Sequence, residues 1–433
     1  MKPALAALAL IALPVLASAL TVAEPYQSGK DLCTKPLPEE IGFFVETPID
    51  YKNPQRGTSP IYAWTLKDFD AAKPSVVYFV GGPGGTPHGY KGLERLAEGY
   101  NVVYFDPRGV KCSRPTDKAL MTDAAYFSSE NTARDAEEIR KHLGVDKWSV
   151  IGHSYGTVTA TINGHLFPER TTAVILEGII YDGTTTLWEA PHRLKILDRF
   201  LAKLPGDLRE KVISWSRRAD VPPEWFSAKA QSIMYQNFPL VELEKQLTDL
   251  FKLSDAEIVK ALNSGETKMF DLLLNMDIPD FGSFLFLHIA CRELTGQSES
   301  AYFLSVFDEN GKLKPATNSP VKKLCKDFGW ETTAESRYES SRYPLTVPVT
   351  YFQGGHDGAT TAEMGISHWK KVPRGPKQLV IFPKGGHSST GSFDTPSLPV
   401  YRAALEGRKI TREMVDTANA SNELKMVFTN KGF

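Results

Sequence analysis

Ser154, Asp357 and His387 are the residues of this sequence whose types and settings could perform nucleophilic catalysis. Ser154 is the centre of Gly-His-Ser-Tyr-Gly at residues 152–156, directly after an apolar run at residues 148–151. A serine at a sharp turn from a strand into a helix presents its hydroxyl as a nucleophile, and the flanking glycines let strand and helix approach without a Cβ clash. The pattern is typical of a nucleophile elbow.

Asp357 and His387 each follow a late apolar run that ends in two glycines. The chain order Ser, Asp, His is that of the α/β-hydrolase triad. In this interpretation His387 accepts the Ser154 proton and later gives it to the leaving group. Asp357 fixes the imidazole tautomer and stabilises the cation.

The predicted oxyanion hole consists of two main-chain N–H groups, one from Tyr155 and one from Gly82 in the glycine-rich loop at residues 81–85. Acyl transfer through a serine needs neither a metal nor an organic cofactor, so none is predicted. We expect the side chain of His153, inside the elbow, to project away from the nucleophile and to serve packing.

Alternating strand-like and helical patterns predict the elements that must position these residues. Apolar runs that alternate with helices imply a parallel sheet with right-handed crossovers and a ligand site at the carboxyl ends of its strands. We therefore predict the α/β-hydrolase fold, a mainly parallel sheet flanked by helices. The expected strands lie at residues 41–48 and 61–66 as an antiparallel pair, then at 75–80, 101–105, 148–151, 172–176, 346–352 and 377–382, with helices at 132–143 and 157–167.

The alternation stops between residues 182 and 343, where helical stretches such as 187–204 and 240–262 replace it. We interpret residues 182–343 as an inserted, mainly helical cap. The catalytic domain is then discontinuous, with residues 24–181 and 344–433. Arg108, after the strand at 101–105, is predicted to form a buried ion pair that fastens its loop.

Residues 1–19 begin with Met-Lys, continue as an apolar segment and end in Ala-Ser-Ala, which is typical of a signal peptide. The protein is therefore expected to be periplasmic or secreted, with no membrane attachment after the signal is removed. The 433 residues carry a net charge of -1 and no basic cluster interleaved with aromatics, so no nucleic-acid partner is expected.

Four cysteines fit an oxidising compartment, and three pairings of them are possible. We predict disulfides Cys33–Cys112 and Cys291–Cys325. The first ties the N-terminal segment to the loop after residues 106–109. The second cross-links two parts of the cap that are far apart in sequence, and closing a long loop most restricts the unfolded chain.

Several segments resemble the serine peptidases of the prolyl aminopeptidase and tripeptidyl aminopeptidase group. They are residues 45–54, 81–85, 106–109 with Ser113, 135–144 and 152–156. Val80 stands where many prolyl aminopeptidases have His, and Cys291-Arg292-Glu293 is similar to a cap feature of the exported tripeptidyl branch.

The resemblance implies an exported enzyme that releases short units, a single residue such as Pro or a tripeptide, from free peptide N-termini. Such an enzyme pairs a carboxylate with the substrate's α-ammonium at a fixed distance from the nucleophile. Glu293 is the first candidate for this carboxylate and Glu177, at the end of the strand at 172–176, is the second. Each has a structural alternative as an ion-pair partner.

Two other functions remain open. The same triad would serve an exported carboxylesterase or lipase-like hydrolase, whose apolar acyl pocket is consistent with cap aromatics such as Phe281, Phe284 and Phe286. A non-catalytic binding protein on a hydrolase scaffold is the third interpretation, and the complete triad argues against it. The sequence predicts neither the length of the released unit nor the oligomeric state.

Overall fold

The computed structural model describes residues 22, 24–33, 41–182, 190–263, 282–294, 305–316, 325–330, 332–390, 397–421 and 423–431. The signal peptide predicted at residues 1–19 lies outside this set, so it stays a prediction.

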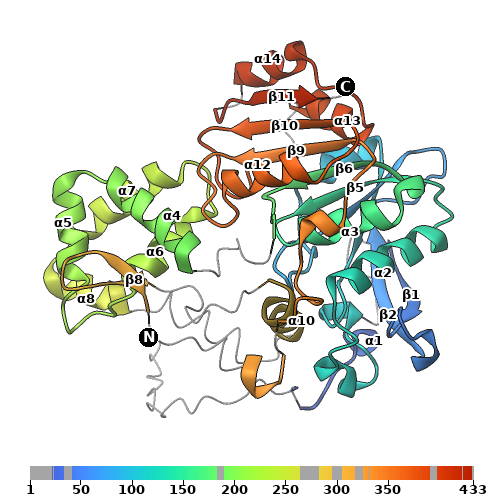
Figure 1. The fold of residues 1–433 in the computed structure, drawn as a ribbon, viewed down its shortest axis with the longest axis horizontal. Helices are drawn as coiled ribbons and strands as arrows, with labels where there is room; N and C mark the ends of the chain where they lie inside the picture. The colour runs from blue at the N-terminus through green and yellow to red at the C-terminus, as the bar shows by residue number, and fades with distance from the viewer. Residues whose placement is uncertain are drawn as a thin grey trace, which may run out of the picture.

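A nine-stranded sheet forms the centre of the structure, in the order β1-β2-β4-β3-β5-β6-β9-β10-β11 (Figure 1). Neighbours from β4 to β10 are parallel, whereas β1, β2 and β11 pair antiparallel at the edges. The predicted mainly parallel sheet is confirmed. The strands are β1 (Ile41–Pro48), β2 (Thr58–Thr65), β3 (Ser75–Phe79), β4 (Asn101–Phe105), β5 (Trp148–His153), β6 (Thr171–Glu177), β9 (Val349–Gly354), β10 (Lys377–Phe382) and β11 (Val427–Lys431).

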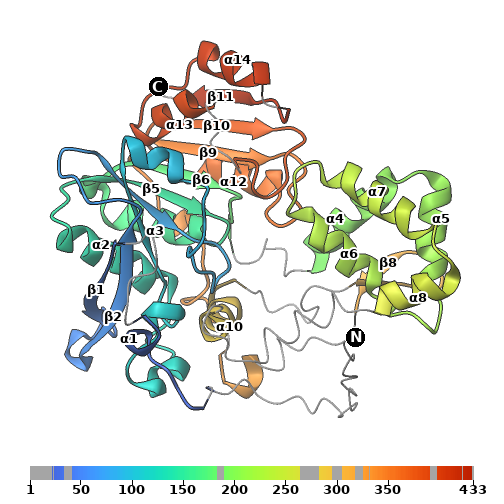
Figure 2. The ribbon, with the colours of Figure 1, turned by 180° about the vertical axis from the view of Figure 1, so that it is seen from behind.

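Helices cover both faces of this sheet (Figures 1 and 2). The central strands are buried on both sides, which explains why their sequences are continuous apolar runs rather than alternating ones. One apolar layer joins the sheet to α2 (Ser129–His142), α3 (Gly156–Leu166) and α12 (Ala362–Lys371). The opposite layer joins it to α13 (Leu398–Leu405) and α14 (Arg412–Ser421). A short helix, α1 (Gly29–Leu32), precedes β1 in the chain.

A mainly helical segment is inserted between β6 and β9. Most of its helices form a lobe beside the sheet, with their own apolar core (Figure 1). The helices are α4 (Ala190–Lys203), α5 (Gly206–Trp215), α6 (Trp225–Met234), α7 (Pro239–Leu250), α8 (Asp255–Asn263) and α10 (Ser283–Ile289), the last followed by the π-helical turn η7 (Ala290–Leu294). A two-stranded hairpin, β7 (Ser305–Phe307) and β8 (Leu313–Pro315), joins this lobe.

Some local expectations were wrong. The helix expected at 240–262 is two helices, because the chain turns between Leu250 and Asp255. The helix expected at 132–143 begins earlier, at Ser129, because Ser128 is its N-cap and accepts a hydrogen bond from the Asn131 N–H. The edge strand β11 and the β7–β8 hairpin were not expected at all.

A buried ion pair fastens the loop after β4, as predicted. The Arg108 guanidinium contacts both Asp135 carboxylate oxygens at 2.6 Å, and both side chains are fully buried. The remaining Arg108 donors bond to the main-chain oxygens of Pro48 and Ile49, at 2.7 Å each. The pair thus ties α2 and the end of β1 to the edge of the sheet at which β4 ends.

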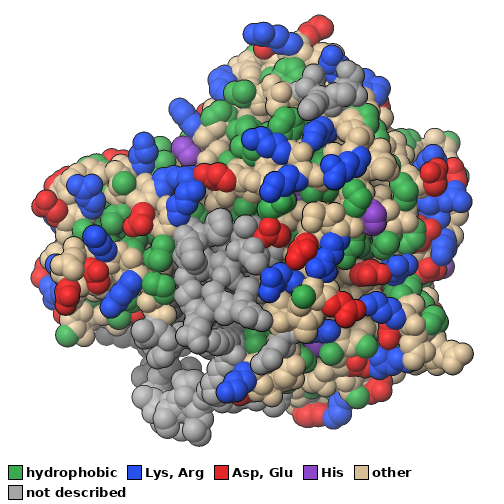
Figure 3. Space-filling view, in the orientation of Figure 1, with side chains coloured by type: hydrophobic (Ala, Val, Ile, Leu, Met, Phe, Trp, Pro, Cys, Tyr) green, Lys and Arg blue, Asp and Glu red, His purple; other side chains and the backbone are tan. Residues whose placement is uncertain are grey.

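Both disulfides pair as predicted, Cys33 with Cys112 and Cys291 with Cys325. On the face shown in Figure 3, acidic and basic side chains are interspersed. No helix within the described residues has the length and apolar character needed to cross a bilayer.

Replacement of Arg108 by Ala should lower the free energy of unfolding by about 3–5 kcal/mol, because Asp135 would remain buried without its partner. Arg134→Ala is the matched control, since its ion pair with Glu130 on the same helix is about one-third exposed and should be worth less than about 1 kcal/mol. Urea denaturation measures both. Arg108→Lys, which keeps the charge without the two-pronged contact, should fall between them. Equal losses in the two alanine variants would contradict this role.

Candidate active site

Ser154 occupies a strained turn between β5 and α3. Its backbone φ of 56° is left-handed, a region that side-chain-bearing residues rarely adopt. A Cβ added at Gly152 would lie 2.4 Å from the Gly156 oxygen, and one added at Gly156 would lie 2.0 Å from the Phe79 oxygen. The two glycines are therefore required by the close approach of strand and helix, as the elbow pattern predicts. The Ser154 N–H donates to the main-chain oxygen of Glu177 at 2.9 Å.

Asp357 and His387 meet beyond the carboxyl ends of the neighbouring strands β9 and β10. The Nδ1 atom of His387 lies 3.0 Å from Oδ2 and 3.1 Å from Oδ1 of Asp357. Asp357 is held in turn by the N–H groups of Ala359 and Thr360 and by the Thr360 hydroxyl, each at 2.8 Å. With Nδ1 committed to Asp357, Nε2 is the nitrogen left for a serine proton.

The surroundings of His387 favour its cationic form. Burial on its own would lower the pKa of this imidazole, but the Asp357 carboxylate beside it, with a further contribution from Glu177, raises the pKa above its usual value. Both side chains of the pair are almost inaccessible to solvent. Asp357 can therefore stabilise the imidazolium that forms when His387 takes up a proton.

The glycine-rich loop after β3 lies directly against the elbow. A Cβ added at Gly81 would be 3.0 Å from the Ser154 Cβ. Gly82 has φ +123°, which favours glycine, and is exposed, whereas Tyr155 is buried. Within the described part of the chain, the N–H groups of Gly82 and Tyr155 donate to no other group. The two N–H groups expected to stabilise an oxyanion are thus available near the nucleophile.

His153 corrects an expectation. Its ring lies against the imidazole of His387, with ring centroids 4.9 Å apart, rather than away from the nucleophile. Its Nε2 is 3.1 Å from the Ser388 hydroxyl. Burial and the neighbouring His387 lower the pKa of His153 to about 3, so it is neutral and packs beside the base without competing for its proton.

Glu293 lies on the π-helical turn η7, a type of distortion that is frequent at functional sites. Its carboxylate accepts hydrogen bonds from the Ser129 N–H, at 3.0 Å, and from the Ser129 hydroxyl. That hydroxyl is 2.9 Å from the Tyr155 hydroxyl, which links Glu293 to the elbow. Burial raises the pKa of Glu293 to about 7, although the Ser129 hydrogen bonds oppose the shift. Glu293 is partly exposed and, with Glu130 and Tyr343, lines a pocket of about 260 Å³.

Glu177 is the last residue of β6 and is 7% exposed. Both of its carboxylate oxygens are held by Thr390, through the N–H at 2.7 Å and through the hydroxyl. Burial raises the pKa of Glu177 to about 7 against these hydrogen bonds. The contact ties the end of β6 to the chain just after His387, so Glu177 supports the loop that carries the base.

Several residues around the candidate triad were not singled out in the sequence. Thr360 contacts both Asp357 and His387, and Gly178 leaves room for the imidazole ring. Asn237, from the inserted helical segment, holds the loop before His387. Apart from the local contact of Thr360 with Asp357, these are tertiary contacts, and no local motif marks them.

One cluster among the described residues has the donor types of a metal site, namely His88, Asp106 and Cys112. Cys112, however, is part of the disulfide with Cys33, so it offers no thiolate. The Asp106 carboxylate instead accepts hydrogen bonds from the Thr86 hydroxyl at 2.6 Å and from the Cys112 N–H at 3.1 Å. The Nε2 atom of His88 lies 2.9 Å from the same carboxylate. The cluster therefore anchors the chain that follows the glycine-rich loop.

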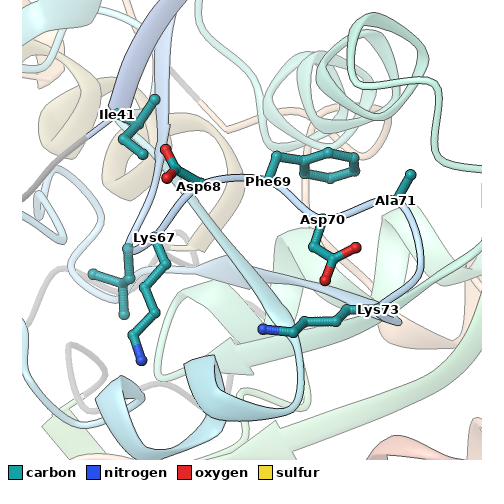
Figure 4. Close-up of a pocket in the computed structure, with 8 residues that line it drawn as sticks. Ile41, Lys67, Asp68, Phe69, Asp70, Ala71 and Lys73 are labelled. Atoms are coloured by element: carbon teal, nitrogen blue, oxygen red, sulfur yellow. The ribbon is translucent and has the colours of Figure 1, made fainter.

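Another pocket, of about 820 Å³, lies on the opposite edge of the sheet (Figure 4). It lies along the connection that follows β2, where the Asp70 N–H bonds to the side chain of Asn101 at the start of β4. None of the candidate catalytic residues lines it. Its lining residues are Ile41, Leu66, Lys67, Asp68, Phe69, Asp70, Ala71 and Lys73.

Comparisons with known proteins match parts of this chain. A family model for the alpha/beta hydrolase fold matches residues 74–232. Proline iminopeptidase aneH of Aspergillus aculeatus is 32% identical over 157 residues, which cover 31% of this chain and 35% of that protein. The probable proline iminopeptidase of Streptomyces coelicolor is 31% identical over 150 residues, which cover 32% and 44%. Serine protease Hip1 of Mycobacterium tuberculosis is 28% identical over 187 residues, which cover 31% and 35%.

The sheet, its flanking helices and the matching family model together define an α/β hydrolase. Within this class, about a third of the chain is similar to proline iminopeptidases, which confirms the resemblance to the prolyl aminopeptidase group. The chain spans between 35% and 44% of the length of the three relatives described above.

Gly178→Ala should disturb His387 specifically. Gly178 has φ +63°, and an added Cβ would lie 2.9 Å from Cε1 of His387. Gly144 has nearly the same φ, +66°, with nothing within 4 Å of an added Cβ. Both alanine variants should lose about 1–2 kcal/mol of stability through backbone strain. Only Gly178→Ala should also lose about a hundredfold in kcat on a chromogenic acetate ester, because the base is displaced. Equal kcat values in the two variants would contradict this placement of His387.

Proposed function

We propose that the protein is an exported serine aminopeptidase that releases short units from the free N-termini of peptides. The observation that carries the proposal is the pairing of buried His387 with Asp357, together with a serine, Ser154, that is held in a strained elbow. In the proposed reaction the Ser154 hydroxyl oxygen attacks the carbonyl carbon of the scissile peptide bond. His387 accepts the hydroxyl proton through Nε2.

The tetrahedral oxyanion accepts hydrogen bonds from the N–H groups of Tyr155 and Gly82. When the intermediate collapses, the carbon–nitrogen bond breaks and His387 gives its proton to the departing amine. The N-terminal unit stays on Ser154 as an ester. Water, deprotonated by the same imidazole, then hydrolyses this ester and restores the serine.

An aminopeptidase must also recognise the substrate's α-ammonium, and we propose the Glu293 carboxylate for this role. Glu293 is partly exposed and lines a pocket, whereas Glu177 is 7% exposed and both of its oxygens are held by Thr390. These differences favour Glu293 over Glu177. The sequence similarity to proline iminopeptidases supports a peptide substrate. The two disulfides are consistent with export, because such bonds persist in oxidising compartments.

Ser154 should be the serine that reacts with a fluorophosphonate probe, because it alone is expected to be activated by His387. Labelling should vanish in Ser154→Ala. Ser388→Ala is the matched control, since Ser388 is also partly exposed and its hydroxyl contacts a histidine, His153. Gel fluorescence after labelling measures both variants. Undiminished labelling of Ser154→Ala would contradict the assignment of the triad.

Acetylation of a peptide's N-terminus should reduce kcat/KM at least about a hundredfold. It removes the positive charge and leaves a desolvated carboxylate unpaired, at a cost on the order of 3 kcal/mol. The ratio of kcat/KM for a free peptide to that for its acetylated form measures this preference. Glu293→Gln should erase most of the ratio by slowing the free peptides, while Glu177→Gln should keep it. The measurement is a panel of chromogenic mono-, di- and tripeptide amides, free and acetylated. Equal rates on free and acetylated peptides would favour an esterase or an endopeptidase.

The same ratio should depend on pH, because the pKa of Glu293 is about 7. Below this pH the carboxyl group is neutral and cannot pair with an ammonium, so the ratio should fall as pH falls through about 7. Above about 8 the substrate amine itself loses its proton, and the ratio should fall again. The titration of His387 affects both substrates and cancels. If the ratio still falls at acidic pH in Glu293→Gln, the fall must come from the titration of another group.

A further inference from the structure

The α6–α7 turn, residues 235–238, interlocks with the loop that carries His387. The Phe238 N–H donates to the Lys384 oxygen at 3.0 Å. The Asn237 side-chain oxygen accepts a hydrogen bond from the Gly386 N–H, also at 3.0 Å. A Cβ added at Gly386 would lie 1.7 Å from the Gln236 oxygen. The inserted helical segment thus contacts the main chain immediately before the candidate base.

Phe238 shows that this contact constrains the turn. Its φ of +54° is left-handed, which is unfavourable for a phenylalanine. Its side chain packs against the apolar cluster of the central sheet rather than against the core of its own lobe. A strained residue persists only where the surrounding structure over-determines it, and such residues cluster at functional sites. The turn is therefore anchored in the catalytic domain.

Tyr235, at the start of the turn, covers the imidazole of His387. The two rings meet edge to face, with centroids 5.2 Å apart and an interplanar angle of 87°. Tyr235 is 41% exposed, whereas His387 is 3% exposed. An aromatic side chain thus lies between the buried base and solvent.

The position of Tyr235 beside His387 matters for the proposed reaction. His387 must hand its proton to the amine of the leaving peptide, so the first residue of that peptide departs beside the imidazole. An exposed aromatic ring at this point offers an apolar wall to the side chain of that residue.

We propose that the α6–α7 turn forms the leaving-group side of the active site. Tyr235 is a specificity-determining residue that favours an apolar side chain at the first position of the leaving peptide. Asn237 is a positioning residue that fixes the His387 loop through Gly386. The proposal rests on the proposed function of Ser154 and His387. It gives Tyr235 a role in specificity and Asn237 a role in positioning.

The test uses peptides that share one N-terminal unit and carry Ala, Leu or Phe at the first leaving position. Tyr235→Ala should lower the ratio of kcat/KM for Phe over Ala by about tenfold, the size expected when a substrate loses one apolar contact surface. Tyr235→Phe should preserve the ratio. Asn237→Ala should lower kcat on all three peptides with little change in KM and no change in the ratio. Asn263→Ala, in α8 and bonded within its own lobe, should match the parent protein.

A second measurement does not need peptide cleavage. An ester forms the acyl-enzyme, and added alaninamide or phenylalaninamide competes with water for it; the yield of the two amide products reports the same subsite. Tyr235→Ala should lower the Phe over Ala product ratio. If peptides are not cleaved but esters are, the aminopeptidase function fails while this measurement still decides the subsite. An unchanged ratio in Tyr235→Ala overturns the role of Tyr235. An unchanged kcat in Asn237→Ala overturns the positioning role.

Discussion

The close approach of β5, α3 and the end of β3 is the constraint on which the candidate site depends. Ser154 can project from the sheet edge only if the chain turns within one residue, and this forces its left-handed φ of 56°. The turn is possible because Gly152 and Gly156 leave no side chain in the space between strand and helix. The Ser154 N–H, which belongs to neither element, is satisfied by the Glu177 oxygen of the neighbouring strand β6. The candidate nucleophile is thus positioned by backbone packing alone.

The order of the strands brings the other groups to this point. β3, β5, β6, β9 and β10 are successive or near neighbours in the sheet and run parallel, so their carboxyl ends share one edge. The glycine-rich loop, the elbow, Glu177, Asp357 and His387 follow these strands in turn. Residues far apart in sequence become neighbours because the main sheet continues after the inserted segment, and β9 then pairs directly with β6.

The sequence was informative where one local requirement determines a residue. Glycines around Ser154, apolar runs in buried strands and the chain order of Ser, Asp and His all reflect such requirements, and the predicted parallel sheet was correct. The α2 boundary was missed because Asn131 also has a side chain that can cap a helix, whereas in the structure Ser128 is the N-cap and Asn131 lies in the first turn. The position of His153 was wrong because side-chain direction at an elbow depends on the His387 loop, which lies far along the chain. Gly178 and Asn237 carry no local signal, since each matters only through a partner on another loop, and Thr360 reaches His387 across two loops in addition to its local contact with Asp357.

Glu177 and Glu293 show how the same residue type acquires different roles from its contacts. Burial raises both pKa values to about 7, so the acidity of the two groups does not separate them. Their partners do. Thr390 takes up both oxygens of Glu177 and thereby fixes the chain after His387, just as Asn237 fixes the chain before it. The candidate base is thus held on both sides, once from the sheet and once from the inserted helices. Glu293 contacts Ser129 at the beginning of α2, where the positive end of the helix dipole favours a carboxylate. Glu293 also borders a pocket, which is why we propose it and not Glu177 for an external cation; both oxygens of Glu177 are already taken up by Thr390.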